Sequence, residues 1–195
     1  MGTGIKLAPP YACLAMGKYE DEVFNTEDEE EKQLLDMVIL WKRFIDDILM
    51  LFKGSEAECG KLVDWLNSIL PGVIKLKCNF SETNLEFLDL KVMIVNGRLE
   101  TELYVKPTNL QLFLTYDSNH PSHCKDAIVY SQALRVIERC SLPDSAQPHL
   151  ESLKGKFLNR KYPEELIDSQ FDRAKLKQRK DLIFQGRKDK TKDNK

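Results

Sequence analysis

The sequence lacks the features of secreted and membrane-spanning proteins. It has no charged leader followed by an apolar stretch, and no apolar run long enough to cross a bilayer. Its five cysteines are scattered and odd in number, which is untypical of a disulfide framework. We therefore expect an intracellular protein of the nucleus or cytoplasm, with reduced thiols and no membrane partner.

The sequence also lacks internal repeats and the paired CxxC or HxxxH spacings of zinc sites. His120, His123 and Cys124 lie close together, but the next cysteine, Cys140, lies far along an expected helix. We therefore predict no zinc site here. The two histidines are interpreted as residues that cap or flank the start of that helix.

Charge is unevenly distributed over the 195 residues, although the formal net charge is only -2. Residues 20–31 hold eight acids and no lysine or arginine, and we expect them to form an exposed helix end and loop. Residues 151–195 hold 14 Lys+Arg against eight Asp+Glu, a net of +6, so the remainder carries -8. A basic C-terminal part suits contact with phosphates, although a solvated charged surface is the commoner meaning of such a bias.

Periodicity predicts a mixture of helices and strands. Helical spacing predicts helices over residues 11–19 and 56–70, and three further helices between residues 118 and 175, with Ser122 capping the first of them and Pro163 opening the last. Short apolar runs predict strands at 37–40 and 48–52, and alternation predicts a strand at 74–80. Asn96-Gly97 predicts a hairpin, because apolar residues alternate with others after it and also before it, where they are Leu88, Leu90, Val92 and Ile94.

Two adjacent carboxylates, Asp46 and Asp47, lie between the first two predicted strands. Aspartate is a common turn residue, so one interpretation is plain turn chemistry. The other is a metal site, because a tight hairpin lets neighbouring carboxylates reach the same side of the backbone. Asp89 is expected on an apolar strand and Asp36 just before the hairpin, and we assign both a structural role.

The residues around this pair resemble reverse transcriptases of Penelope-like retroelements. Residues 44–47, Phe-Ile-Asp-Asp, are similar to that family's aromatic-x-Asp-Asp box, and residues 4–14 to the box that precedes it. Residues 87–90, 103–108 and 118–123 resemble its stretch from palm to thumb. The similarity runs from about Gly4 to about Ile167, with several boxes in order.

The resemblance implies RNA-directed DNA polymerisation by two-metal nucleotidyl transfer, with Mg²⁺ or Mn²⁺ as cofactor. Asp46 and Asp47 would be the catalytic metal ligands, and the partners would be an RNA or DNA template with a DNA primer, and deoxynucleotides. The hairpin around Asn96-Gly97 would grip the primer strand, or it is a plain sheet edge. The expected nucleic-acid contacts are Gly4, Lys6, Pro9, Lys75, Lys77, Lys106 and Lys161, and further basic residues on the C-terminal helices are Lys154, Lys156, Arg160, Arg173, Lys175, Lys177 and Arg179.

In that family a third carboxylate comes from a strand before the first box, and no such strand precedes Gly4 in this sequence. We therefore expect a palm-and-thumb fragment that is weak or inactive alone. The expected fold is α+β, with a partial antiparallel palm sheet and packed helices in residues 1–117. A three-helix, thumb-like module that resembles a helix-turn-helix follows in residues 118–184, and residues 185–195 form a disordered basic tail.

A non-catalytic hypothesis stays open beside this one. The helical region could act as a helix-turn-helix-like nucleic-acid-binding or protein-binding module derived from a retroelement, with the acid pair as a relict.

Overall fold

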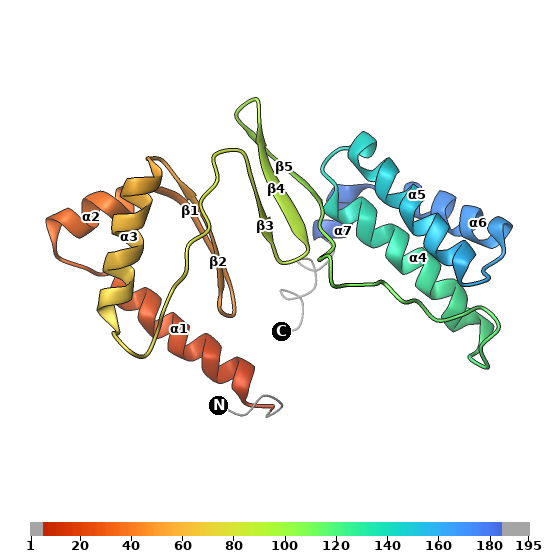
Figure 1. Ribbon diagram of the computed structural model, residues 1–195, viewed down its shortest axis with the longest axis horizontal. Helices are drawn as coiled ribbons and strands as arrows, with labels where there is room; N and C mark the ends of the chain where they lie inside the picture. Colours follow the sequence, from red (N-terminus) through yellow and green to blue (C-terminus); the bar gives the residue numbers. More distant parts are fainter. Residues whose placement is uncertain (1–5, 185–195) are drawn as a thin grey trace, which may run out of the picture. The chain divides into compact units, whose positions relative to one another are not determined.

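The computed structural model describes residues 6–184 and shows an α+β chain, as the sequence predicts. The chain divides into two compact units, Met1–Glu82 and Thr83–Lys195. Each unit has its own helices and its own small antiparallel sheet (Figure 1). The three-stranded sheet belongs by its contacts to the second unit, whereas the sequence grouped it with residues 1–117. Residues 185–195, the expected basic tail, lie outside the described part of the chain.

The core of the first unit forms between two amphipathic helices. Helix α1 (Ala8–Phe24) begins with two prolines in its first turn, where their missing N–H groups cost no helical hydrogen bond. Its buried residues Met16, Tyr19 and Val23 pack with Leu62 and Leu66 of helix α3 (Glu56–Ile69). The Tyr19 hydroxyl donates a buried hydrogen bond to the Leu66 carbonyl at 2.8 Å, so the two helices are joined by a polar contact as well as by packing.

The acidic stretch is more ordered than predicted. Helix α1 continues to Phe24, and a second helix, α2 (Glu29–Asp36), follows within the expected loop. The Asp28 carboxylate caps α2 by accepting hydrogen bonds from the N–H groups of Glu30 and Glu31. Acids in the first turn also suit the positive end of the helix dipole, which is why this charged segment forms a helix.

Strands β1 (Val38–Phe44) and β2 (Asp47–Phe52) form the predicted hairpin. Trp41, Ile48, Met50 and Phe52 pack against the core of the first unit. The pairing shifts register between Val38 and Leu40, so the sheet has a local irregularity at its base.

The predicted strand at 74–80 is wrong: this segment has no strand partner. Its alternation is real, because Ile74 and Leu76 pack into the core while Lys75 and Lys77 are exposed. The Asn67 side chain replaces a neighbouring strand, since its amide accepts from the Leu76 N–H at 2.7 Å and donates to the Leu76 carbonyl at 3.2 Å. The segment is therefore held along α3 instead of in a sheet.

The second unit begins with a three-stranded meander, β3 (Asn84–Phe87), β4 (Leu90–Val95) and β5 (Arg98–Leu103). Asn96 and Gly97 both have positive φ, as a two-residue hairpin turn of type I′ requires, so this prediction is confirmed. Leu88 and Asp89, which the sequence placed on a strand, instead form a second two-residue turn between β3 and β4.

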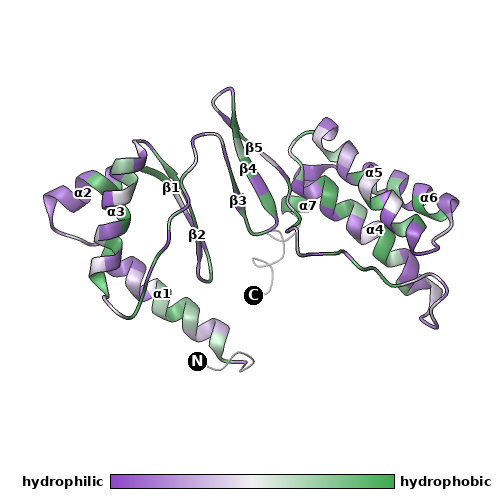
Figure 2. Ribbon diagram, viewed as in Figure 1, coloured by the Kyte–Doolittle hydropathy of each residue, from purple (hydrophilic) through white to green (hydrophobic). Residues whose placement is uncertain are grey.

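Four helices follow: α4 (Ser122–Arg139), α5 (Pro143–Asn159), α6 (Glu164–Lys175) and α7 (Arg179–Phe184). The predicted cap by Ser122 is wrong, because Pro121 is the N-cap and no side chain caps α4. Polar and apolar stretches alternate along α4, α5 and α6 (Figure 2), and their apolar faces build one core around Val129, Ala133, Phe157 and Ile167. None of the helices in residues 6–184 is long and apolar enough to cross a membrane.

Candidate functional site

The acid pair lies at the tip of the β1–β2 hairpin. Phe44 pairs with Asp47, so Ile45 and Asp46 are the two residues of the turn and Asp47 is the first residue of β2. Only Ile45 has positive φ, at 57°, and this sign pattern is that of a type II′ turn, one of the two preferred two-residue hairpin turns. Both carboxylates are exposed at this end of the hairpin.

Ile45 adopts a backbone conformation that its side chain disfavours. Glycine is the usual residue with positive φ at this position, and a β-branched residue there is a genuine outlier. Such strain costs on the order of 1–3 kcal/mol and clusters at functional sites. The tip of this hairpin therefore combines a strained backbone with two exposed carboxylates.

Arg43 and Glu20 connect the turn to helix α1 through hydrogen bonds. Arg43 Nη1 donates to the Ile45 carbonyl at 2.9 Å, and Arg43 Nη2 donates to Glu20 Oε2 at 2.9 Å. Trp41 Nε1 donates to the other oxygen of the same carboxylate at 2.8 Å. Arg43 Nε also lies 2.9 Å from Glu20 Oε1, but it is not aligned for a hydrogen bond.

This contact is electrostatically strong. The hydrogen bond from Arg43 holds the pKa of Glu20 below its ordinary value, and the same bond raises the pKa of Arg43. Both side chains are mostly shielded from solvent, with 16% and 19% of their surfaces exposed, so water screens them less than a surface pair. The turn is thereby tied to α1.

The two carboxylates at the tip have no such partners. Among residues 6–184, neither the Asp46 nor the Asp47 carboxylate has a hydrogen bond or an ion pair. That part of the chain also contains no group of three histidine, cysteine, aspartate or glutamate side chains that could hold a metal ion. The hairpin therefore presents two uncompensated negative charges to solvent.

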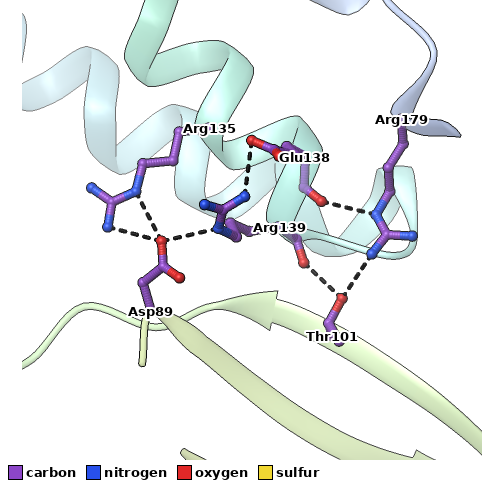
Figure 3. A network of polar contacts seen from close by, with 6 residues as sticks. All are labelled: Asp89, Thr101, Arg135, Glu138, Arg139 and Arg179. Atoms are coloured by element: carbon purple, nitrogen blue, oxygen red, sulfur yellow. Dashed lines mark hydrogen bonds and ion pairs between the residues drawn. The ribbon is translucent and has the colours of Figure 1, made fainter. Parts of the chain in front are cut away.

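A second hairpin in the same chain gives an internal comparison. The turn between β3 and β4 has the same order of an aromatic residue, an aliphatic residue and aspartate, Phe87-Leu88-Asp89, and Leu88 has the same φ of 57° as Ile45. Here, however, Asp89 Oδ2 accepts from Arg139 Nε at 2.9 Å and from Arg135 Nε and Nη2 at 3.2 Å each (Figure 3). Asp89 thus joins this turn to α4, in agreement with the structural role expected from the sequence.

The two arginines that bind Asp89 favour its ionised form. Burial by itself would raise the pKa of Asp89, but the hydrogen bonds from Arg139 and Arg135 outweigh burial and hold the pKa below its ordinary value. Arg139 also pairs with Glu138 at 2.8 Å. Two equivalent turns therefore carry one compensated aspartate and one uncompensated aspartate, and the uncompensated one is Asp46.

The other predicted contact residues lie at the surface. Lys6 and Pro9 are exposed at the start of α1, and Gly4 lies outside the described residues. Lys75 and Lys77 are exposed on the segment along α3, and Lys106 is exposed shortly after β5. Lys161 has 72% of its side chain exposed but pairs with Asp117 at 2.5 Å, which raises the pKa of the lysine.

The helical region has the arrangement of a three-helix unit with a tight turn. Helix α4 packs against both α5 and α6, and residues 160–163 join α5 to α6. Lys161 takes a left-handed conformation in this turn, at φ 66°, where glycine is common. Tyr162 is buried beside Phe157 and Tyr116, with ring centroids 5.0 and 5.2 Å apart, and so fixes the turn to the core.

Residues 112–172 match the family model of an animal helix-turn-helix domain. The match begins before α4 and ends within α6, so it covers α4, α5, most of α6 and the segment that leads into them. No curated protein and no solved structure gives a significant match to the chain. The helix-turn-helix-like part of the sequence prediction is thereby supported by an independent comparison.

Sequence reasoning missed the residues that fix these features. Glu20 lies in a run of acids that the sequence predicts to be an exposed helix end and loop, and nothing in its spacing points to Arg43. Arg135 and Arg139 are one helical turn apart, which places them on one face of α4, and this spacing is a signal that could have indicated a shared anion. Their partner, Asp89, lies too far away in the sequence to be deduced.

Proposed function

We propose that this chain is the hairpin-bearing and helical part of a reverse transcriptase, which binds a primer–template duplex and holds Mg²⁺ at Asp46 and Asp47. The observation that carries this proposal is the pair of exposed, uncompensated carboxylates on a strained turn. The contrast with Asp89 supports it, because the same kind of turn elsewhere in the chain satisfies its aspartate with two arginines. The proposed reaction class is supported by the resemblance of the sequence boxes around the hairpin to those of reverse transcriptases.

The two carboxylates supply some, but not all, of the ligands that a hard divalent cation needs. Two carboxylates supply oxygen ligands, and Mg²⁺ commonly uses one or two protein carboxylates together with waters and substrate phosphates. When bound, such an ion would stabilise charge at the primer hydroxyl and the nucleotide phosphates. Because residues 6–184 contain no third acid near the pair, we expect weak metal affinity and little synthesis by this chain alone.

Metal binding can be tested by iron-directed cleavage. Fe²⁺ in place of Mg²⁺, with ascorbate and peroxide, cuts the backbone near the bound ion, and mass spectrometry locates the cuts. We expect cuts around residues 44–48 that Mg²⁺ suppresses and that Asp46→Asn/Asp47→Asn removes. Asp36→Asn is the matched control, because Asp36 is also an exposed acid of this unit. Cuts that persist in the double variant would refute the metal site.

Primer extension tests the activity. We expect at most weak extension of a DNA primer on an RNA or DNA template in Mg²⁺. Robust synthesis that Asp46→Ala abolishes would establish the polymerase reaction and refute the expectation that this chain is insufficient. Synthesis that survives Asp46→Ala would point to a contaminating polymerase.

A second candidate function is nucleic-acid binding without catalysis, and the match of residues 112–172 to a helix-turn-helix family favours it. Duplex binding in EDTA separates the two candidates. Binding that persists in EDTA and in Asp46→Asn supports the module alone. Binding that requires a divalent cation and fails in Asp46→Asn supports the polymerase proposal. Absence of duplex binding at low salt would contradict both.

A further inference from the structure

The third helix of the matched region carries the wrong charge for a helix that enters a DNA groove. In helix-turn-helix proteins the N-terminal residues of the second motif helix contact base edges, with phosphates on both sides. Here that end of α6 carries Glu164, Glu165 and Asp168, and its two cations, Arg173 and Lys175, lie in its last turn. Lys154 pairs with Glu164 and Asp168, at 2.8 and 2.7 Å, so one lysine compensates only part of this charge.

The matched region as a whole is also acidic. Residues 112–172 contain seven Lys+Arg and nine Asp+Glu, a net charge of -2. Nearly all of its cationic side chains already donate hydrogen bonds within the chain, to carbonyl oxygens, an amide oxygen or carboxylates. These cations are Lys125, Arg135, Arg139, Lys154, Lys156 and Lys161. Arg160 is the exception, so the three packed helices offer little free positive charge to a polyanion.

Positive charge appears where the family match ends. Residues 173–195 contain ten Lys+Arg and three Asp+Glu, a net charge of +7. Within the described part, Lys177 and Lys180 are exposed, and their ammonium groups have no partner. Lys175 is also exposed and lies 3.8 Å from an exposed acid, Asp172, which is a weak surface contact.

One arginine fixes this basic segment to the folded unit. Arg179 Nε donates to the Glu138 carbonyl at 3.0 Å, and Arg179 Nη2 donates to Thr101 Oγ1 at 3.2 Å (Figure 3). The start of α7 is thereby tied to the end of α4 and to β5. Lys177 and Lys180 lie on either side of this anchor, so their backbone positions are set by the fold.

We infer that the helical unit binds nucleic acid through the phosphates, by Lys175, Lys177 and Lys180 of a basic segment that follows the helix-turn-helix-like core, and that α6 does not read bases in a groove. This inference rests on the proposed nucleic-acid binding and names the surface that performs it. Binding of this kind is independent of base sequence, because phosphates carry no sequence information.

The test measures binding of the full chain to a labelled duplex of random sequence over a range of salt concentrations. For Lys177→Gln/Lys180→Gln we expect the slope of log K against log salt to become shallower by about 1.8, since each phosphate contact contributes about 0.9, and affinity near about 0.1 M salt to fall roughly 60-fold. The matched control is Lys53→Gln/Lys61→Gln, which removes the same charge from exposed positions of the first unit. We expect no change of slope in the control.

A second variant examines α6 directly. Ser169 and Gln170 are neutral polar residues of α6 that could reach base edges if the helix lay in a groove. We expect Ser169→Ala/Gln170→Ala to leave affinity unchanged. Weaker binding by this variant, or an unchanged salt slope in the lysine variant, would overturn the inference while duplex binding itself still stands. Absence of binding by the unaltered chain would instead contradict the proposed function.

Vesicles provide the remaining comparison, because a basic segment also attracts anionic lipids. We expect vesicles that contain phosphatidylserine to compete with the duplex only weakly. Tighter binding to those vesicles than to the duplex, lost in Lys177→Gln/Lys180→Gln, would assign the basic segment to a membrane surface and refute the nucleic-acid inference.

Discussion

Replacing the aspartate in each of the two equivalent turns should separate structural from functional roles. Asp89→Asn removes the charge that binds Arg135 and Arg139, whereas Asp46→Asn removes a charge that has no partner in the described chain. Both changes preserve the side-chain shape and lie at the same position of the same kind of turn. We expect Asp89→Asn to destabilise the second unit and Asp46→Asn to leave the stability of the first unit unchanged.

The magnitude follows from the contacts. Asp89 receives three charge-assisted hydrogen bonds at 2.9 to 3.2 Å, and such bonds contribute about 1.5–3 kcal/mol when shielded. The asparagine oxygen can still accept one of them, and 29 to 36% of each of the three side chains is exposed, so we expect a loss of about 1–2 kcal/mol. For a unit of this size, that lowers Tm by roughly 5–10 °C.

The assay can distinguish the two units. Both tryptophans, Trp41 and Trp65, lie in the first unit, so their fluorescence reports its unfolding, whereas far-UV circular dichroism reports the helices of both units, α4 to α7 being those of the second. Asp89→Asn should lower the midpoint of the helical signal that is lost apart from the fluorescence change, and it should leave the fluorescence midpoint in place. An equal loss in Asp46→Asn, or no loss in Asp89→Asn, would refute the assignment of roles.

The effect of Asp89→Asn should depend on pH. The pKa of Asp89 is held below its ordinary value of 3.8, so the folded state favours the ionised carboxylate. Its contribution is complete above that value and is lost as pH falls through the lower, folded pKa. The difference in Tm between Asp89→Asn and the unaltered chain should therefore be full at neutral pH and shrink towards zero in strong acid. A difference that stays constant into strong acid would contradict an ionic origin.

Two further predictions concern the first unit, and tryptophan fluorescence in urea can measure both. Glu20→Gln leaves Arg43 without its counter-charge in a mostly shielded position, and we expect a loss of about 2 kcal/mol, with Glu22→Gln as the exposed control. Tyr19→Phe removes the hydrogen bond to Leu66 and should cost about 1 kcal/mol. Because burial raises the pKa of Tyr19 from 10.0 to about 12, the unaltered chain should lose more stability than Tyr19→Phe between these pH values.

Local patterns predicted the elements whose stability depends on nearby residues. Asn96-Gly97 specifies a tight turn because both residues tolerate positive φ, and the structure has this turn. The helical spacing of residues 56–70 likewise predicts α3, since one stripe of apolar residues faces the core. The α+β class follows from such local information.

Two strand predictions were wrong because side chains from other parts of the chain bind these segments. Alternation at 74–80 predicted a strand, but Asn67 of α3 supplies the hydrogen bonds that a neighbouring strand would have made. Leu88 belonged to an alternating run, yet it lies in a turn that Arg135 and Arg139 hold through Asp89. Alternation shows only which side of the chain is buried, and the partner decides whether a sheet forms.

The sequence by itself determined the identity and order of the acid pair, the hairpin that carries it and the amphipathic helices that follow, because each depends on residues a few positions apart. Only the tertiary structure decided which aspartate is paired with arginines and which cationic side chains are already hydrogen-bonded within the chain. It also decided that Ile45 has a strained backbone. Those properties depend on contacts such as Glu20 with Arg43 and Asp89 with Arg139, between residues far apart in the chain. Charge compensation is a property of three-dimensional proximity, so no count of charges along the sequence could have assigned it.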